Sequence, residues 1–392
     1  MSRAGNLLRY SATRLALAPV MLWLIATLVF LLLRVAPGDP VDAVLGSRAP
    51  AEVKAKMREQ LGLDQSLLHQ YLDYLQGLLP VHVERTPDVS DIEGLRNLSW
   101  ISIDFTTPWD GQHLFLGIGS DLIDLGRSLL NEETVLSIIG RTLPASLELS
   151  VIALVMAAVI GLSIGFTGIA RPEGKLDFAG RLYGLGTYAL PPFWIAMLVQ
   201  LLFAVVLGWL PVGGRFPPSL IPPDGSGFYL FDCIQSGDWG GLRGTVRHLI
   251  LPASTLALLL SGTFTTALRL NLRRTLRSDY VEAARSRGLS EAQVVLRHGL
   301  PNALLPVLTI AGITVASLIG GALLIEVTFS WPGIALRLQE AINQRDYPVV
   351  QGIVVVIAAL VVLVSITVDL ICLLYTSPSP RDKRQPRMPS SA

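Results

Sequence analysis

Charged residues are scarce in this sequence: they make up 16% of its 392 residues, whereas hydrophobic residues make up 51% and the mean hydropathy is +0.53. Soluble domains usually carry about 25% charged residues, so this shortage argues against a water-soluble globular protein. The 31 basic and 30 acidic residues nearly cancel, which gives no reason to expect nucleic acid as a partner. Cysteine is scarcer still, because only Cys233 and Cys372 occur, far apart, and they predict neither a disulfide framework nor a metal site.

Two stretches resemble enzyme motifs, but neither indicates an enzyme on closer inspection. The stretch from Gly168 to Leu176 resembles a phosphate-binding loop, but its glycines are wrongly spaced and Leu176 stands where Ser or Thr is required, so we expect no ATPase in this chain. The stretch from Gly161 to Gly165 fits G-x-S-x-G, which makes an intramembrane hydrolase using Ser163 an alternative. That motif needs a strand, a turn and a helix, however, and small residues inside an apolar helix favour helix packing.

Long apolar runs are plentiful. A membrane-spanning helix needs about 20 mostly apolar residues, and six segments meet this length. They are 15–34, 146–169, 183–208, 247–270, 303–326 and 349–374. The first is too long for a signal peptide, so we expect a retained helix. The sequence therefore predicts an all-α polytopic membrane protein with six transmembrane helices, in which Pro191 and Pro192 either break or kink the third.

The basic residues predict the orientation, because Lys and Arg in short loops stay on the cytoplasmic side. Three arginines precede the first helix, and the loops between helices two and three and between helices four and five are rich in basic residues. These are Arg3, Arg9, Arg14, Arg171, Lys175, Arg181, Arg269, Arg273, Arg274, Arg277, Arg285, Arg287 and Arg297. We expect a cytoplasmic N-terminus at 1–14 and an extracytoplasmic subdomain at 35–145. The transmembrane core would then occupy 146–374.

The cytoplasmic loop 279–301 carries a distinct pattern. Glu282, Ala283 and Ala284 precede Gly288, and Ser290 with Gln293 fits a capping box. Gly288 suits the left-handed residue that ends a helix. The pattern predicts two short helices that form a compact knob, with both alanines allowing close approach of a partner.

This loop resembles the EAA loop of binding-protein-dependent ABC importer permeases, and the string through His298, Asn302 and Pro306 resembles the dipeptide, oligopeptide and nickel permease family. The resemblance implies the type I importer permease fold and a coupling helix that enters a groove of the ATPase. Carried over onto this sequence, the ATPase-coupling residues are Glu282, Ala283, Ala284, Arg285 and Gly288. A local role, in which Glu282 caps its own helix and the arginines only mark the inner side, is the simpler alternative.

Other segments match the same family in order, so the resemblance covers nearly the whole chain. They are Pro37 to Pro40, Leu61 to Asp64, Gln70, Tyr71, Tyr74, Asp124 to Ser128, Leu143 to Leu149, Pro191 to Phe193, Leu249 to Pro252, Glu326 to Gly333 and Asp346 to Pro348. The resemblance implies a transporter subunit of the inner (plasma) membrane, not an enzyme. It further implies two nucleotide-binding ATPase subunits that hold ATP and Mg, a second homologous permease subunit, an extracytoplasmic substrate-binding protein and membrane lipid as partners. This chain itself would bind no cofactor.

Two segments depart from the family pattern. Residues 81–120 form an insertion that enlarges the outer subdomain. From Cys372 the family's usual ending is missing, and 372–392 resembles a translated sequencing adapter, with a disordered tail as the alternative.

The main rival function is an ion-coupled secondary transporter. That class commonly shows internal repeats and ionisable residues at the membrane midplane. Glu326 and Arg269 are expected at helix ends, where anchoring at the interface is the ordinary role, and Glu326 is also a candidate for bordering the translocation path. The cargo stays open among dipeptides, oligopeptides, nickel chelates, glutathione and sugars.

Overall fold

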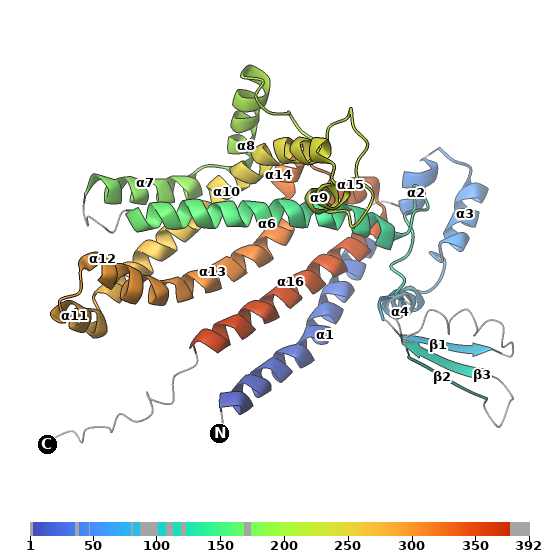
Figure 1. Ribbon diagram of the computed structural model, residues 1–392. Helices are drawn as coiled ribbons and strands as arrows, with labels where there is room; N and C mark the ends of the chain where they lie inside the picture. The colour runs from blue at the N-terminus through green and yellow to red at the C-terminus, as the bar shows by residue number, and fades with distance from the viewer. Residues whose placement is uncertain are drawn as a thin grey trace. The chain divides into compact units, whose positions relative to one another are not determined.

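The computed structural model describes residues 3–35, 39–46, 48–79, 81–86, 101–106, 113–118, 123–167 and 174–376. Helices dominate this part of the chain, and the fold divides into two compact units (Figure 1). The first unit comprises Met1–Val20, Pro144–Leu336 and Ala359–Ala392. The second comprises Met21–Leu143 and Arg337–Ala358.

The first unit is organised around one long helix, α10 (Trp239–Leu276). It packs against helices on several sides, which are α7 (Lys175–Ala189), α8 (Pro192–Gln200), α9 (Tyr229–Ser236), α13 (Leu300–Gly321) and α14 (Leu323–Thr328). Its most apolar stretch is 61% buried, the highest share among the helices that could cross a membrane in the described chain. The helix is therefore a central element of the unit rather than a lipid-facing one.

Helix α6 (Val135–Thr167) packs against α10 through two glycines. Gly161 lies against the backbone of Ser261 and the side chain of Phe264, and its carbonyl accepts a 3.0 Å hydrogen bond from the hydroxyl of Thr265. Gly165 meets the next turn of α10 in the same way, while Ser163 faces outward and is exposed. The predicted packing role of G-x-S-x-G is confirmed, since small residues let two backbones approach closely.

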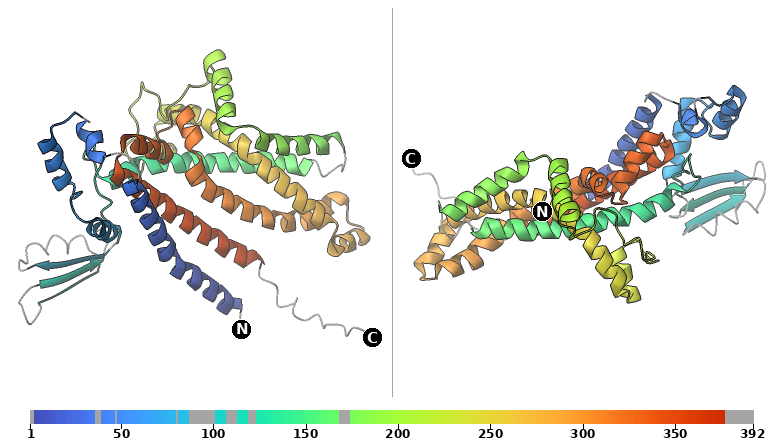
Figure 2. Two further views of the ribbon diagram at one scale, coloured as in Figure 1. Left: turned by 180° about the vertical axis from the view of Figure 1, so that it is seen from behind. Right: turned by 90° about the horizontal axis from the view of Figure 1, so that it is seen from above.

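The third expected span, 183–208, is divided between two helices. A break or a kink at Pro191 and Pro192 was expected, and α7 and α8 are bent by 100° at the break around Pro191 (Figures 1 and 2). Pro192 occupies the first position of α8, where its missing N–H costs nothing, and α8 continues into the π-helix η2 (Leu201–Val206). Of the two readings of this proline pair, the break is therefore correct. The described chain has five helices able to span a membrane, or six when this bent pair is counted as one span.

Two of the remaining helices extend beyond their expected spans at both ends. The N-terminal helix α1 covers Arg3–Val35, and α16 covers Tyr347–Thr376. Between them in sequence, α13 ends at Gly321, where the short α14 and then α15 (Ile334–Gln344) follow. Residues 377–392, which hold most of the adapter-like segment, lie outside the described residues.

The second unit contains three short helices, α2 (Pro40–Leu45), α3 (Ala51–Gln60) and α4 (Leu67–Leu78). Asp39 caps α2 by accepting a 2.9 Å hydrogen bond from the backbone N–H of Val41, and its other oxygen pairs with Arg58 of α3. On α4, the hydroxyl of Tyr71 shares a 2.6 Å hydrogen bond with the hydroxyl of Thr27, and the ring of Tyr74 stacks on Phe30 of α1. These contacts give Asp39, Tyr71 and Tyr74, which match the family pattern, structural roles in the second unit.

Two further matched segments meet within the second unit. The buried carboxylate of Asp346 accepts hydrogen bonds from the hydroxyl of Ser128 and from the backbone N–H of Leu129. Gly126, with φ of 83°, lies against Pro348. Segments that are more than two hundred residues apart thus form one polar contact.

A small antiparallel sheet lies within the expected insertion. Its strands are β1 (Val81–Thr86), β2 (Ile101–Thr106) and β3 (His113–Ile118), in the order β1-β3-β2. Val81 and Ile101 both pair with Ile118, so β3 is the central strand (Figure 2). The all-helical prediction did not include these strands.

Candidate functional site

The loop 279–301 begins with a helix that has one buried and one exposed face. Helix α11 (Asp279–Ser286) buries Val281 and Ala284 against Val294 and Leu276. Glu282 and Ala283 lie on the exposed face of the same helix. Apolar residues three apart share one helical face, which explains why two neighbouring alanines point in different directions.

The turn after α11 follows the sequence prediction. Gly288 has φ of 79°, the left-handed conformation that ends a helix, and a Cβ there would meet open space. Ser290 then caps the next helix, α12 (Glu291–Gln293), in a capping box with Gln293. The expected stop and restart are both confirmed.

The second half of the loop is not a separate short helix. It runs from α12 through the π-helix η3 (Val294–Gly299) directly into α13. Gly299 lies against Leu272 and Leu276 near the end of α10, and Asn302 donates a 2.9 Å hydrogen bond to the hydroxyl of Tyr280. The expected compact knob is therefore fixed to the ends of both α10 and α13.

Arg285 braces this loop from within. Its guanidinium donates to Glu291 at 2.7 Å and to the carbonyl of Leu276 at 3.3 Å. The hydrogen bond to Glu291 raises the pKa of Arg285 above its usual value. Both side chains are largely exposed, so the ion pair adds little to the stability of the protein. Its role is to fix the angle between α11 and α12.

The predicted coupling residues differ in exposure. Ala284 is 5% exposed and packs inside the loop. The other four, Glu282, Ala283, Arg285 and Gly288, are exposed. The expectation that both alanines admit a partner needs correction, because only Ala283 offers its side chain to one. Ala284 and Arg285 instead hold the shape of the surface.

Glu326 packs inside the protein, and its expected place at the membrane interface stays a prediction. Its carboxylate is fully buried and accepts hydrogen bonds from the hydroxyl of Ser146 and, at 2.9 Å, from the backbone N–H of Leu336. The same hydroxyl accepts a 2.8 Å hydrogen bond from the N–H of Ile334. Glu326 thus joins α14, α6 and the start of α15, and its place beside a translocation path stays a prediction.

Arg269 is also buried within the protein, and its expected place at the membrane interface likewise stays a prediction. It is 6% exposed and pairs with the fully buried Asp177 of α7. A second buried pair, Glu148 with Arg215 at 2.6 Å, lies in the same unit. Asp177 and Glu148 were both missed in the sequence, because their buried partners Arg269 and Arg215 are 92 and 67 residues away.

No group of three or more His, Cys, Asp or Glu side chains able to hold a metal ion occurs among the residues that the structure describes.

Comparison with known proteins decides the family. The binding-protein-dependent transport system inner membrane component family matches residues 157–375, which is more than half of the chain, and the N-terminal model of the same transport systems matches residues 7–89. The chain belongs to this family. It is accordingly a multi-pass membrane component of a transport system rather than an enzyme.

Relatives of known name match over nearly the full length. The di/tripeptide transport system permease protein DppB of Pseudomonas aeruginosa is 36% identical over 97% of this chain and 100% of its own length. The dipeptide permease DppB of Alkalihalophilus pseudofirmus is 32% identical over 96% of this chain and 100% of its own, and DppB of Escherichia coli K12 is 31% identical over 91% and 93%. Among solved structures, an amino acid ABC transporter with histidines shows a TM-score of 0.39 and 15% identity over 61% of this chain and 93% of that one, which is too low to compare folds.

Proposed function

We propose that this chain is the permease subunit of an ATP-binding-cassette importer whose cargo is peptides or related small solutes. Separate nucleotide-binding subunits, which hold ATP and Mg, would supply the energy. The similarity to dipeptide and di/tripeptide permeases over nearly the whole chain supports this cargo class. The permease would act by alternating access, without chemistry on the cargo.

The proposal for energy coupling rests on the exposed face of α11. Glu282 and Ala283 present a charge beside a small side chain, which suits a helix that fits into a groove of another protein. The loop behind them is fixed to α10 and to α13. A force applied to α11 would therefore reach two long helices of the first unit.

The proposed orientation places this loop and the N-terminus in the cytoplasm, since basic residues concentrate there. The opposite ends of the helices would face a substrate-binding protein outside the membrane. A second homologous permease subunit would complete the pathway, and Glu326 is the ionisable residue that we propose beside it.

Association with the ATPase tests the proposal. Glu282→Lys reverses the exposed charge without touching the packed face, so ATPase subunits should no longer copurify with the tagged, detergent-solubilised permease. Glu52→Lys is the matched control, because Glu52 is an exposed glutamate on α3 of the second unit. A wild-type protein that never copurifies with an ATPase would favour the ion-coupled rival.

Cargo is tested separately by uptake competition. Cells that depend on this permease should lose uptake of a labelled dipeptide when unlabelled di- and tripeptides are added. A transition-metal chelate should compete poorly. Stronger competition by the chelate than by peptides would contradict the proposed cargo.

A further inference from the structure

One cluster of charges in the first unit has no role in the proposed coupling. The carboxylate of Asp177, fully buried on α7, faces the guanidinium groups of three arginines. Arg273 donates to it at 2.6 Å, Arg269 is bound to the same oxygen, and Arg181 lies 3.4 Å from the other oxygen. Three positive charges thus meet one negative charge, which leaves the cluster strongly cationic.

The most buried of these arginines has unused hydrogen-bonding capacity. One terminal nitrogen of Arg269 donates to the side chain and to the backbone carbonyl of Asp177, but its other terminal nitrogen, Nη1, is buried without a hydrogen-bond partner. That nitrogen lies over Gly180, where no Cβ covers it. A buried, unsatisfied donor on a charged group is costly, so an anionic ligand that accepts from it would be favoured.

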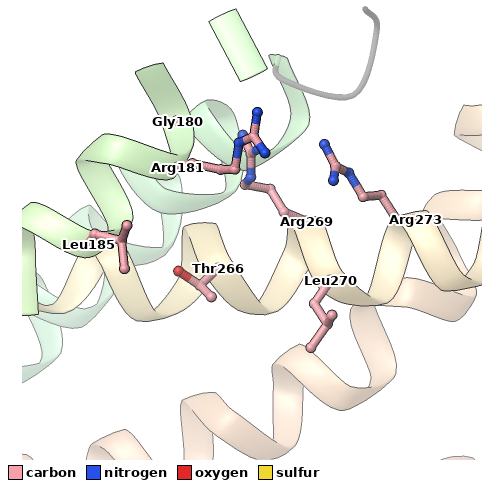
Figure 3. Close-up of a pocket in the computed structure, with 7 residues that line it drawn as sticks. All are labelled: Gly180, Arg181, Leu185, Thr266, Arg269, Leu270 and Arg273. Carbon is pink, nitrogen blue, oxygen red and sulfur yellow. The ribbon is translucent and has the colours of Figure 1, made fainter. Parts of the chain in front are cut away.

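A cavity of about 290 Å³ opens beside this cluster. It is lined by Gly180, Arg181, Arg269 and Arg273 together with Leu185, Thr266 and Leu270, and Figure 3 shows the guanidinium groups of the three arginines gathered on one side of it. The side chains of Arg181 and Arg273 are 51% and 41% exposed, so they can turn toward a ligand that enters from outside. The rim of the cavity is apolar where Leu185 and Leu270 line it, and these side chains are 71% and 62% exposed.

We propose that this cavity binds a phosphate group, and that the phosphate is the headgroup of an anionic phospholipid. Planar guanidinium groups match phosphate oxygens in a two-point geometry. The cluster lies in the last two turns of α10, which ends at Leu276, and therefore near the end of a helix that can span the membrane. The exposed leucines on the rim would contact acyl chains, and basic pockets between transmembrane helices are suited to such headgroups.

Native mass spectrometry of the purified, detergent-solubilised permease tests this proposal. Phosphatidylglycerol should bind to the wild-type protein, and zwitterionic phosphatidylcholine should bind much more weakly. The double substitution Arg181→Gln and Arg273→Gln should reduce binding of phosphatidylglycerol by about tenfold or more, because it removes two charged donors but leaves Asp177 paired with Arg269. Arg274→Gln is the matched control, since Arg274 is an exposed arginine next to Arg273 that does not line the cavity.

Added inorganic phosphate separates the two sources of the anion. Binding of the lipid that persists in millimolar phosphate supports the lipid, whereas displacement by phosphate supports a site for free phosphate. Equal loss of binding in the Arg274→Gln control and in the double variant would overturn the site, because the effect would then come from surface charge alone.

A second measurement does not depend on the variants folding. A photoactivatable phosphatidylglycerol analogue, cross-linked to the wild-type protein, should label peptides from α7 and from the end of α10. Labelling spread evenly over all apolar helices would overturn the proposal.

Discussion

Gly161 illustrates how a single residue positions two helices. The space for a Cβ at Gly161 is filled by the backbone of Ser261 and by Phe264, whereas Ser163 two residues later is exposed. The motif G-x-S-x-G is therefore explained by contact between α6 and α10, and Ser163 lies on the exposed side of α6. The sequence allowed this conclusion because the motif lay in an apolar helix.

Gly161→Val should destabilise the protein by about 1 to 3 kcal/mol, since overpacking forces α6 away from α10. Ser163→Val introduces the same side chain on the exposed face and should change little. Thermal unfolding of the two variants in detergent measures the difference. Equal melting temperatures would show that the close approach of the helices is not required.

Asp39 offers a test by pH at the same scale. Burial alone would raise the pKa of this carboxyl, but the hydrogen bond and charge of Arg58 outweigh it and hold the pKa below its usual value. A lowered pKa in the folded state adds stability above the unfolded pKa of about 3.9, and that stability is lost as the pH falls through the folded value.

Asp39→Asn keeps a residue that can cap α2 but removes the charge, so it should lower stability at pH 7 by up to about 1 kcal/mol. The difference from wild type should narrow as the pH falls from the unfolded pKa of about 3.9 through the lower folded pKa, because the wild-type carboxyl then becomes neutral as well. Thermal unfolding across this pH range measures the difference, with Glu52→Gln, at an exposed glutamate on α3, as the control. A difference that is constant with pH would show that the charge of Asp39 is not involved.

Individual pairings were the least predictable feature of the molecule. Asp177 and Arg269 are 92 residues apart, and Glu148 and Arg215 are 67 apart. Nothing in the local pattern of either acidic residue indicates its partner, because the pairing depends on how whole helices pack. The buried partners of Arg269 and Glu326 were missed for this reason.

At the scale of elements, apolar length predicted the long helices well, and local signals predicted their ends. The capping box at Ser290 and the left-handed Gly288 both appear as expected. The sheet was missed, although Val81 and Val83 alternate with polar residues, as do Ile101, Ile103 and Phe105. That period of two is the signal of a strand, and it was available in the sequence.

Gly288 allows a test of backbone conformation separate from side-chain contact. Gly288→Ala should weaken coupling of ATP hydrolysis to transport, because alanine in the left-handed conformation costs about 1 kcal/mol and the space around it is open. Asparagine tolerates that conformation, so Gly288→Asn should retain most of the coupling. Peptide-stimulated ATPase activity of the reconstituted transporter is the measurement. Equal losses in both variants would instead indicate that a partner contacts this position.

At the scale of the whole molecule, family membership is carried by the length of the match rather than by any one motif. The chain aligns with permeases of dipeptide systems over nearly its whole length, from its N-terminal helix to its helical core. The segments matched in the sequence also contact one another within the structure, as Ser128 and Asp346 do. Their shared spacing therefore reflects shared packing.

The central claim is that the exposed face of α11 transmits the work of a separate ATPase. Reconstitution of the permease in liposomes with the proposed ATPase subunits, second permease and binding protein tests it most directly, with ATP-dependent dipeptide uptake as the readout. We expect Glu282→Lys to abolish uptake and ATPase association, while Glu52→Lys leaves both near the wild-type level. Unchanged uptake by the Glu282→Lys transporter, with ATPase still bound, would contradict the account.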